Sequence, residues 1–531
     1  NFSVNNNTFY LDSTNTSYTN LSDAYNAATD NDNIIIGAGT YTGNGNIGLN
    51  LSKNLTISAD MNKTVIFDAT NSATSILTIT NYTTVTLTGL TFINVNNTES
   101  FHGTGAIMNM GNLNVNYCTF ANNTAITGGA IENYYGNVNV NKSNFENNSA
   151  SHGGAISNYN GYLSVTLSNF YKNNATESYG GAIRNLGNLT VDYTYFTDNY
   201  AKVNGGAISN SYNSNAFIIG AFTNNNAENS GGAVNNVGNL FIDDSLFNNN
   251  RAIGFLGGAI RNNGTLIVLD SSFWDNSAIY GGAIDNTIGD ARIEDSIFIN
   301  NTAYHGGAVT NYANGTLKVI GSNFTLNNAN DDFGGAIRNN GTCSVDNSTF
   351  TNNTAKINGG AISNSYDSVI NVTNSKFINN SASTCGGALN SVCNMAVVNS
   401  SFTENFAEEG GAIRSNGTLS VYGSSFSNNY GGFVGGAIRN QGPMTIYDST
   451  FANNTALDGG AIASNSLDNT ITIQNSDFLN NTAELGGAIS SIYNDLNINN
   501  CKLYSNSVYS DMYLVDSNVS GGGAIAQFYG K

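Results

Sequence analysis

Gly128-Gly129-Ala130-Ile131-x-Asn133 opens a block of about 25 residues that decides the fold of this chain. The block continues through Val138-x-Val140 and ends in Phe145-x-Asn147-Asn148. Its opening tetrapeptide returns at Gly153, and similar blocks follow almost to the last residue. A fixed period of this length is typical of solenoid proteins, in which each repeat stacks on the next.

Two series of residues recur in step along the chain. After an imperfect copy at Gly103, the Gly pairs lie 24 to 28 residues apart and begin at Gly128, Gly153, Gly180, Gly205, Gly231, Gly257, Gly281, Gly306, Gly334, Gly359, Gly386, Gly410, Gly435, Gly459 and Gly486. A Phe series runs in parallel from Phe120 to Phe478, with Leu503 at the last position. Because the spacing varies by so little, insertions are expected only in the turns.

Each block predicts three short strands: Ala-Ile-x-Asn, Leu-x-Val, and the segment that leads into Phe-x-Asn-Asn. No two-residue hairpin turn joins alternating strands within a block, so each strand must pair with the same strand of the next block. The prediction is an all-β protein, a right-handed parallel β-helix of about 20 coils spaced about 4.8 Å apart. Such a stack is expected to be about 100 Å long.

Alternation along the strands assigns their faces. The Ile, Leu, Val and Phe series is expected to form the core, and the inward Asn side chains are expected to hydrogen-bond to their equivalents and to the turn backbone. The Gly pair would allow either a positive φ angle or a close approach to the neighbouring coil. Where the residue after Gly-Gly-Ala-Ile is Arg, it is expected to point outward, away from the core, as at Arg184, Arg261, Arg338, Arg414 and Arg439.

Residues 1–60 lack the repeat and are predicted to form an N-terminal cap and first coil, followed by β-helix repeats over residues 61–531 with signature copies at about 103–527. Leu21, Ala24, Tyr25 and Ala28 have helical spacing. A short amphipathic helix is therefore expected to cover the open end of the solenoid. No such cap follows Gly522, which predicts that more chain, another domain or another subunit covers that end.

The charge and hydropathy of the chain argue against two functional classes. The formal net charge is −19, whereas nucleic-acid binding requires a basic surface. No apolar run approaches the roughly 20 residues that cross a bilayer, so no direct membrane insertion is expected. The five cysteines, Cys118, Cys343, Cys385, Cys393 and Cys501, have no metal-binding spacing. Cys385 and Cys393 either form a disulfide across one turn or, like the other three, fill small apolar positions.

The Gly-Gly-Ala-Ile and Phe-x-x-Asn series resembles the repeats of the polymorphic outer-membrane proteins of chlamydiae and those of adhesin-like surface proteins of methanogenic archaea. The resemblance covers roughly residues 100–527. The segment from Leu21 to Tyr41 is similar to the cap of pectin-lyase-like β-helices. The resemblance implies a secreted protein at the cell surface. It leaves the ligand open, because these families differ in what they bind.

Pectin-lyase-like folds also include polysaccharide lyases and hydrolases, and hydrolysis needs two carboxylates about 5 to 9.5 Å apart. The adjacent acid pairs are Asp243-Asp244, Asp331-Asp332 and Glu408-Glu409. The last two pairs lie three coils apart, roughly 14 Å, and all three are expected to be solvated acids. His102, His152 and His305 are too many coils apart to share a metal. We therefore expect no enzymatic activity, no cofactor and no metal site.

Tyrosines gather in the turn after Gly-Gly-Ala-Ile-x-Asn: Tyr134, Tyr135, Tyr159, Tyr212, Tyr312, Tyr366 and Tyr493. They are expected to lie along one edge, where aromatic faces would bind sugars or a partner protein, or else to cover the turn backbone. Asn54, Asn122 and Asn379 begin Asn-x-Ser/Thr sequons and are candidate glycosylation sites if the protein is secreted.

The predicted function is that of an extracellular, cell-surface adhesin-like or structural protein without catalysis. Its variable turns would contact glycans or proteins of a host or neighbouring cell. One alternative is a filament or surface-coat subunit that assembles as a homo-oligomer through its C-terminal coil. A polysaccharide lyase or hydrolase is a further alternative.

Overall fold

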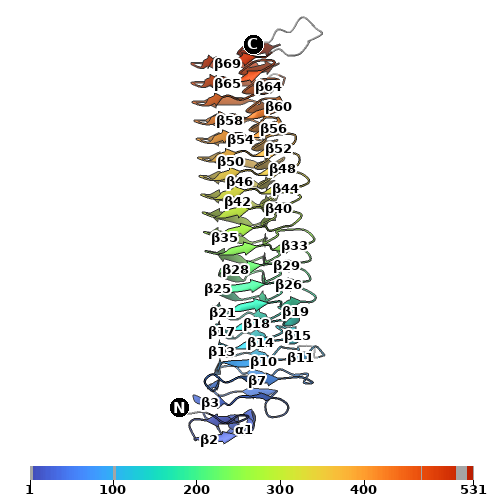
Figure 1. Ribbon diagram of the computed structural model, residues 1–531, viewed down its shortest axis with the longest axis vertical. Helices are drawn as coiled ribbons and strands as arrows, with labels where there is room; N and C mark the ends of the chain where they lie inside the picture. The colour runs from blue at the N-terminus through green and yellow to red at the C-terminus, as the bar shows by residue number, and fades with distance from the viewer. Residues whose placement is uncertain (1–3, 100–102, 468, 510–522, 530–531) are drawn as a thin grey trace. The chain divides into compact units, whose positions relative to one another are not determined.

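The structure is a computed structural model that describes residues 4–99, 103–467, 469–509 and 523–529. Within these residues the chain forms a parallel β-solenoid of about 19 turns, with one α-helix. It divides into two compact units, residues 1–266 and 267–531. The same turn is built repeatedly in each unit, and the strands of successive turns lie over one another (Figure 1). The predicted fold class is confirmed.

A turn of unit 1 consists of β16 (Ile131–Tyr134), β17 (Asn137–Asn141), β18 (Asn144–Glu146) and β19 (Ser149–His152). The corresponding turn of unit 2 consists of β45 (Ile337–Asn339), β46 (Thr342–Asp346), β47 (Thr349–Thr351) and β48 (Thr354–Ala355). Each strand pairs in parallel with its equivalent one turn on, so that Ile131 lies opposite Ile156. The sequence analysis did not predict the fourth strand, because this strand is too short to show an alternation of apolar and polar residues.

The strand that starts with the Ile of Gly-Gly-Ala-Ile is called the Ile strand below. In unit 1 the Ile strands include β12 (Ile107–Asn109), β16, β20 (Ile156–Tyr159), β24 (Ile183–Asn185), β27 (Ile208–Asn210), β30 (Val234–Asn236) and β34 (Ile260–Asn262). In unit 2 they include β37 (Ile284–Asn286), β41 (Val309–Asn311), β45, β49 (Ile362–Asn364), β53 (Leu389–Ser391), β57 (Ile413–Ser415), β61 (Ile438–Asn440), β64 (Ile462–Asn465), β68 (Ile489–Ile492) and β72 (Ile525–Phe528).

Identical side chains stack on one another in the core. The rings of Phe145 and Phe170 lie 4.6 Å apart and within 3° of parallel in unit 1, and those of Phe298 and Phe324 do the same in unit 2. All four rings are fully buried. This offset stacking follows from the spacing of parallel strands, which places each ring one turn above its equivalent.

Buried Asn side chains form hydrogen-bonded ladders. Asn199 donates from Nδ2 to Phe170 O and to Asn225 Oδ1, both at 3.0 Å. Its own Oδ1 accepts from N and Nδ2 of Asn173, both at 3.0 Å. Every polar atom of the buried amide is thus satisfied. A second ladder runs along the ends of the Ile strands, where Asn133 donates to Asn158 Oδ1 at 2.7 Å. Both ladders confirm the predicted role of the inward Asn.

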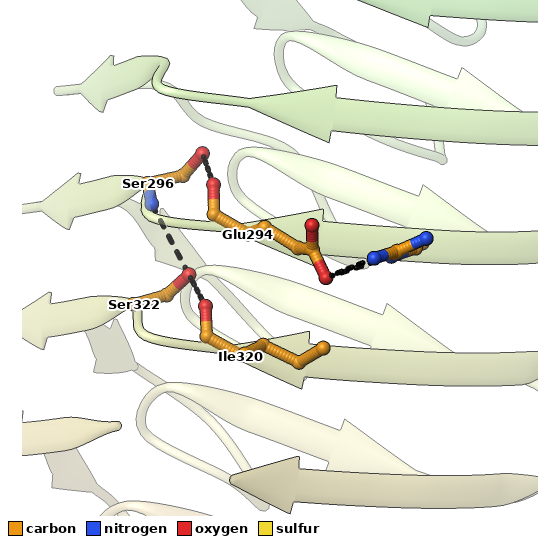
Figure 2. A network of polar contacts seen from close by, with 5 residues as sticks. Glu294, Ser296, Ile320 and Ser322 are labelled. Carbon is orange, nitrogen blue, oxygen red and sulfur yellow. Dashed lines mark hydrogen bonds and ion pairs between the residues drawn. The ribbon is translucent and has the colours of Figure 1, made fainter. Parts of the chain in front are cut away.

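Serines satisfy the backbone at the bend between the second and third strands of most turns. In unit 2 the amide N of Ser296 donates to Oγ of Ser322 at 3.2 Å. The two hydroxyls donate in turn to the carbonyl oxygens of Glu294 and Ile320, at 2.7 and 2.8 Å (Figure 2). Each bend therefore shares its hydrogen bonds with the next turn.

The two glycines of each pair have different roles. Gly205 has a φ of +70°, a conformation that L side chains rarely adopt. A Cβ on Gly206 would lie 2.1 Å from the carbonyl oxygen of Gly232, one turn on. The first glycine of the pair therefore provides the positive φ angle, and the second allows the close approach to the neighbouring coil, the two explanations expected from the sequence.

The N-terminal cap is more elaborate than predicted. Helix α1 (Leu21–Ala27) is present, with Asn20 Oδ1 accepting from the amide N of Asp23 at 2.8 Å, and it buries Leu21 and Ala24. It contacts β1 (Phe9–Leu11) and β2 (Thr16–Tyr18), which pair antiparallel with each other. The sequence did not predict this antiparallel pair, because the strands are short and no hairpin motif joins them.

We expect Asn199→Leu to lower the free energy of unfolding by at least about 3 kcal/mol, because buried donors on Asn173 and acceptors on Phe170 and Asn225 lose their partner. Denaturant unfolding would measure this loss. Asn139→Ser is the control, since Asn139 is exposed on β17 and its replacement should change stability by no more than about 0.5 kcal/mol. Equal losses of stability in the two variants would contradict the stabilising role of the Asn ladder.

We expect Gly206→Ala to destabilise the protein by about 1–3 kcal/mol, because the added methyl group meets the backbone of the next turn. Gly432→Ala is a matched control, since a Cβ there would lie 3.4 Å from its nearest neighbour. Thermal unfolding of both variants should show the larger loss at Gly206.

Candidate functional site

The residue that follows Ile in each Ile strand forms a polar column. Within unit 1 Glu132 lies opposite Ser157, and Ser157 lies opposite Arg184. The Arg residues of this column point away from the core, as the sequence predicted, since Ile183 and Asn185 on either side of Arg184 are fully buried, but the sequence did not predict that the column is covered. Ser157 is buried, Arg184 is half-buried, and the equivalent Arg439 of unit 2 is buried.

The segment before each Gly pair covers the column. In unit 2 the ring of Phe333 lies 5.7 Å from the guanidinium carbon of Arg338, and Thr310 Oγ1 donates to the carbonyl oxygen of His305 at 3.0 Å. Backbone bridges such as Tyr179 to Asn204 join these segments from turn to turn in unit 1. Alternation alone cannot reveal this cover, because it says which face of a strand a residue occupies but not what packs there.

Unit 2 contains a groove along this column, called the amide groove here. It encloses about 700 Å³, and its lining includes Arg338, Asn340, Asn358, Ser363, Tyr366 and Asn390. The Oδ1 atoms of Asn340, Asn358 and Asn390 are buried without a hydrogen-bond partner. The Tyr366 side chain at the border is 76% exposed. The groove thus combines unsatisfied amide oxygens, a guanidinium group and an open aromatic ring.

Unit 1 contains a second groove, called the acid groove. It encloses about 500 Å³ and is lined by Thr104, Met108, Thr127, Glu132, Tyr134, Ser157, Tyr159 and Arg184. Glu132 is only 7% exposed, and its Oε2 has no hydrogen-bond partner. Its carboxyl is the single acid in the lining. The sequence analysis missed Glu132, although an acid at this position of the repeat was the available signal.

Burial dominates the electrostatics of the acid groove. It raises the pKa of Glu132 from 4.5 to about 7, while the hydroxyls of Ser157 and Thr127 and the charge of Arg184 act in the opposite direction. Burial also lowers the pKa of Arg184, and Glu132 counters that shift. Perturbed groups beside a cavity are typical of binding and catalytic sites.

The predicted tyrosine edge is divided into separate sites. In unit 1 the rings of Tyr134 and Tyr159 stack at 5.2 Å, and Tyr135 meets both edge-on. Tyr212 is 76% exposed. In unit 2 Tyr312 lies against Tyr280 at 5.7 Å, Tyr493 stacks on Tyr529 at 5.0 Å, and Tyr366 borders the amide groove. Tyr134 and Tyr159 cover part of each other's faces, whereas Tyr212 and Tyr366 keep open rings.

The predicted acid pairs do not form carboxylate clusters. Asp331 is exposed and pairs with Lys356 Nζ at 2.9 Å, whereas Asp332 Oδ2 lies 2.8 Å from His305 Nδ1. Glu409 Oε2 accepts from the Cys385 thiol at 3.9 Å. Asp243 is half-buried and Asp244 and Glu408 are exposed. Among the described residues no group of three His, Cys, Asp or Glu side chains could hold a metal ion. His102 and residues 510–522 lie outside the described parts of the chain.

The remaining predicted residues lie at simple structural positions. All five cysteines are free thiols, so Cys385 and Cys393 do not form a disulfide. Cys343 is buried in the core, where burial raises the pKa of its thiol to about 12. Of the sequon residues, Asn122 and Asn379 are exposed and Asn54 is half-buried. No helix in the described ranges is long and apolar enough to cross a membrane.

Fold and grooves together define the class of protein: a parallel β-solenoid with grooves along its Ile strands. Four segments, residues 142–159, 193–211, 347–365 and 448–465, match the Chlamydia polymorphic membrane protein repeat. Each segment contains the Phe of one turn and the Gly-Gly-Ala-Ile of the next. No curated protein matches the chain.

Solved structures with some similarity are polysaccharide lyases. A mutant of the PL6 family alginate lyase AlyGC is 11% identical with a TM-score of 0.29, over 95% of this chain and 98% of that one. The structure of AlyGC itself is 10% identical with a TM-score of 0.21, over 96% of this chain and 99% of that one. A mannuronic acid specific polysaccharide family 6 lyase from human gut microbiota is 11% identical with a TM-score of 0.18, over 84% of this chain and 82% of that one. Similarity at this level carries no information about the substrate or chemistry of this chain.

We expect Glu132→Gln to change how stability depends on pH. The folded protein binds the Glu132 proton more tightly than the unfolded chain does, so stability falls as the pH rises from about 4.5 to about 7 and stays low above that. The cost reaches at most about 3 kcal/mol. The variant should therefore gain more stability over the wild type at pH 8 than at pH 5.

Denaturant unfolding at pH 5, 6, 7 and 8 would measure this difference. Glu146→Gln is the control, since Glu146 is exposed in the next strand but one and should give no such trend. A gain for Glu132→Gln that is the same at every pH would contradict the raised pKa.

Proposed function

We propose that this β-solenoid belongs to an extracellular, cell-surface adhesin-like protein, without enzymatic activity, that binds saccharides in the amide groove. The observation that carries the proposal is the set of buried, unpartnered amide oxygens beside Arg338 and the open ring of Tyr366. Sugar hydroxyls would donate to the amides and accept from the guanidinium, and a sugar face would pack on the tyrosine. A volume of about 700 Å³ is within the range of ligand sites.

The energetics support a ligand at this place. A buried polar atom without a partner costs roughly 1–3 kcal/mol, and a ligand that supplies the missing donor recovers part of that cost. Asn390 is 4% exposed and donates from Nδ2 only to Ser363 Oγ, at the long distance of 3.5 Å. Its Oδ1 is available to a donor that enters the groove.

Two further observations support the cellular role and the lack of catalysis. The matched segments belong to a repeat of Chlamydia polymorphic membrane proteins, and the repeats also resemble those of adhesin-like surface proteins. The amide groove has a single carboxylate, Asp367, in its lining, and the acid groove has only Glu132. Glycoside hydrolysis normally uses two carboxylates.

We expect Tyr366→Ala to weaken glycan binding by at least tenfold, because the open ring at the groove border is lost. Binding of the intact chain would be screened on a glycan array and quantified by calorimetry. Tyr212→Ala is a matched control, since Tyr212 has the same position in its repeat and is also 76% exposed. Equal effects of the two variants, or no glycan binding, would overturn the saccharide site, and cleavage of a bound glycan would overturn the non-catalytic role.

A further inference from the structure

The acid groove contains two opposite charges that are not paired with each other. Glu132 and Arg184 lie in the same column with Ser157 between them, so their Cα atoms are separated by two strand spacings, roughly 9.6 Å. Both residues are in the described part of unit 1, and none of the ion pairs found among the described residues joins their side chains. Glu132 is buried and Arg184 is half-buried, and a charge removed from water is stabilised by a partner of opposite charge.

Each charged group has an unsatisfied atom. Oε2 of Glu132 is buried without a hydrogen-bond partner, and so is Nε of Arg184. The carboxylate needs a donor and the guanidinium needs an acceptor. The hydroxyls of Ser157 and Thr127 act on the Glu132 carboxyl but leave its Oε2 without a donor, and Thr104 Oγ1 is already engaged with Ser75 Oγ at 2.6 Å.

The space around the two charges is largely apolar. Met108 lies opposite Glu132 on the side away from Arg184. The stacked rings of Tyr134 and Tyr159 form one wall, and an aromatic wall favours an ammonium group or an aliphatic chain over a hydrated ion. A cation alone would satisfy Glu132 but face the charge of Arg184, and an anion alone would face Glu132.

From this arrangement we propose that the acid groove binds a small zwitterion, with its ammonium group at Glu132, its carboxylate at Arg184 and its carbon chain against Tyr134 and Tyr159. The site is separate from the amide groove, and the proposal does not depend on saccharide binding there. One molecule of this kind supplies the donor and the acceptor that the groove lacks and leaves no charge unpaired.

Calorimetry of the intact chain with simple probes tests the site. The probes are ω-amino acids with two to six carbons, together with the alkylamine and the alkylcarboxylate of each length. We expect at least one zwitterion to bind tenfold or more tightly than both of its singly charged counterparts. No binding, or an amine or a carboxylate that binds as tightly as the zwitterion, would overturn the proposal.

Two variants separate the contributions of the two charges. Glu132→Gln should reduce zwitterion and amine binding by at least tenfold and should strengthen carboxylate binding, because the repulsion by Glu132 is removed. Arg184→Gln should reduce zwitterion and carboxylate binding and should strengthen amine binding, because the repulsion by Arg184 is removed. Glu146→Gln and Arg251→Gln remove exposed charges from the same unit and serve as controls. Equal losses in the control variants would show a general charge effect and overturn the assignment to this groove.

Discussion

Main-chain hydrogen bonds join the strands of each described repeat to their equivalents one turn on, at the spacing of a parallel sheet, about 4.8 Å. This registry places each residue directly against the residue with the same position in the next repeat. Ring therefore stacks on ring, as in Phe145 and Phe170, and amide bonds to amide, as in Asn199 and Asn225. Glycine is required where carbonyl groups of adjacent turns approach, as at Gly206. The repeat is conserved within the chain because each copy must fit its neighbours.

The same registry explains where unsatisfied polar atoms occur. A ladder of identical Asn side chains satisfies itself, because each amide offers both a donor and an acceptor to the next. In the column formed by the residue after Ile, successive turns carry different side chains: Glu132, Ser157 and Arg184 stand in consecutive turns. Their neighbours leave some of their polar atoms without a hydrogen-bond partner, and the segments before the Gly pairs cover them. Buried and unmatched groups therefore gather in this column, and both grooves lie along it.

The sequence predicted the solenoid, its parallel pairing, its core residues and the capping helix, because these depend on periodicity and on local spacing. It did not predict that the polar column is covered, or that the tyrosines of one turn fall into separate sites. Arg184 was expected to point outward, but alternation cannot reveal that another segment packs over the strand. The tyrosines share one turn of the repeat, yet Tyr134 and Tyr159 stack on each other while Tyr366 stands open beside a groove. The acid groove was missed altogether, since Glu132 resembles any outward residue in the sequence.

By itself, the sequence determined how each turn is built, because Gly, Ile, Asn and Phe at fixed spacing admit only stacking in register. The tertiary structure decided which polar residues are buried without partners. That outcome depends on the segment before each Gly pair, which varies in length and composition and folds over the Ile strands. The desolvation of Glu132, which raises its pKa to about 7, arises only once that cover and the neighbouring turns are in place.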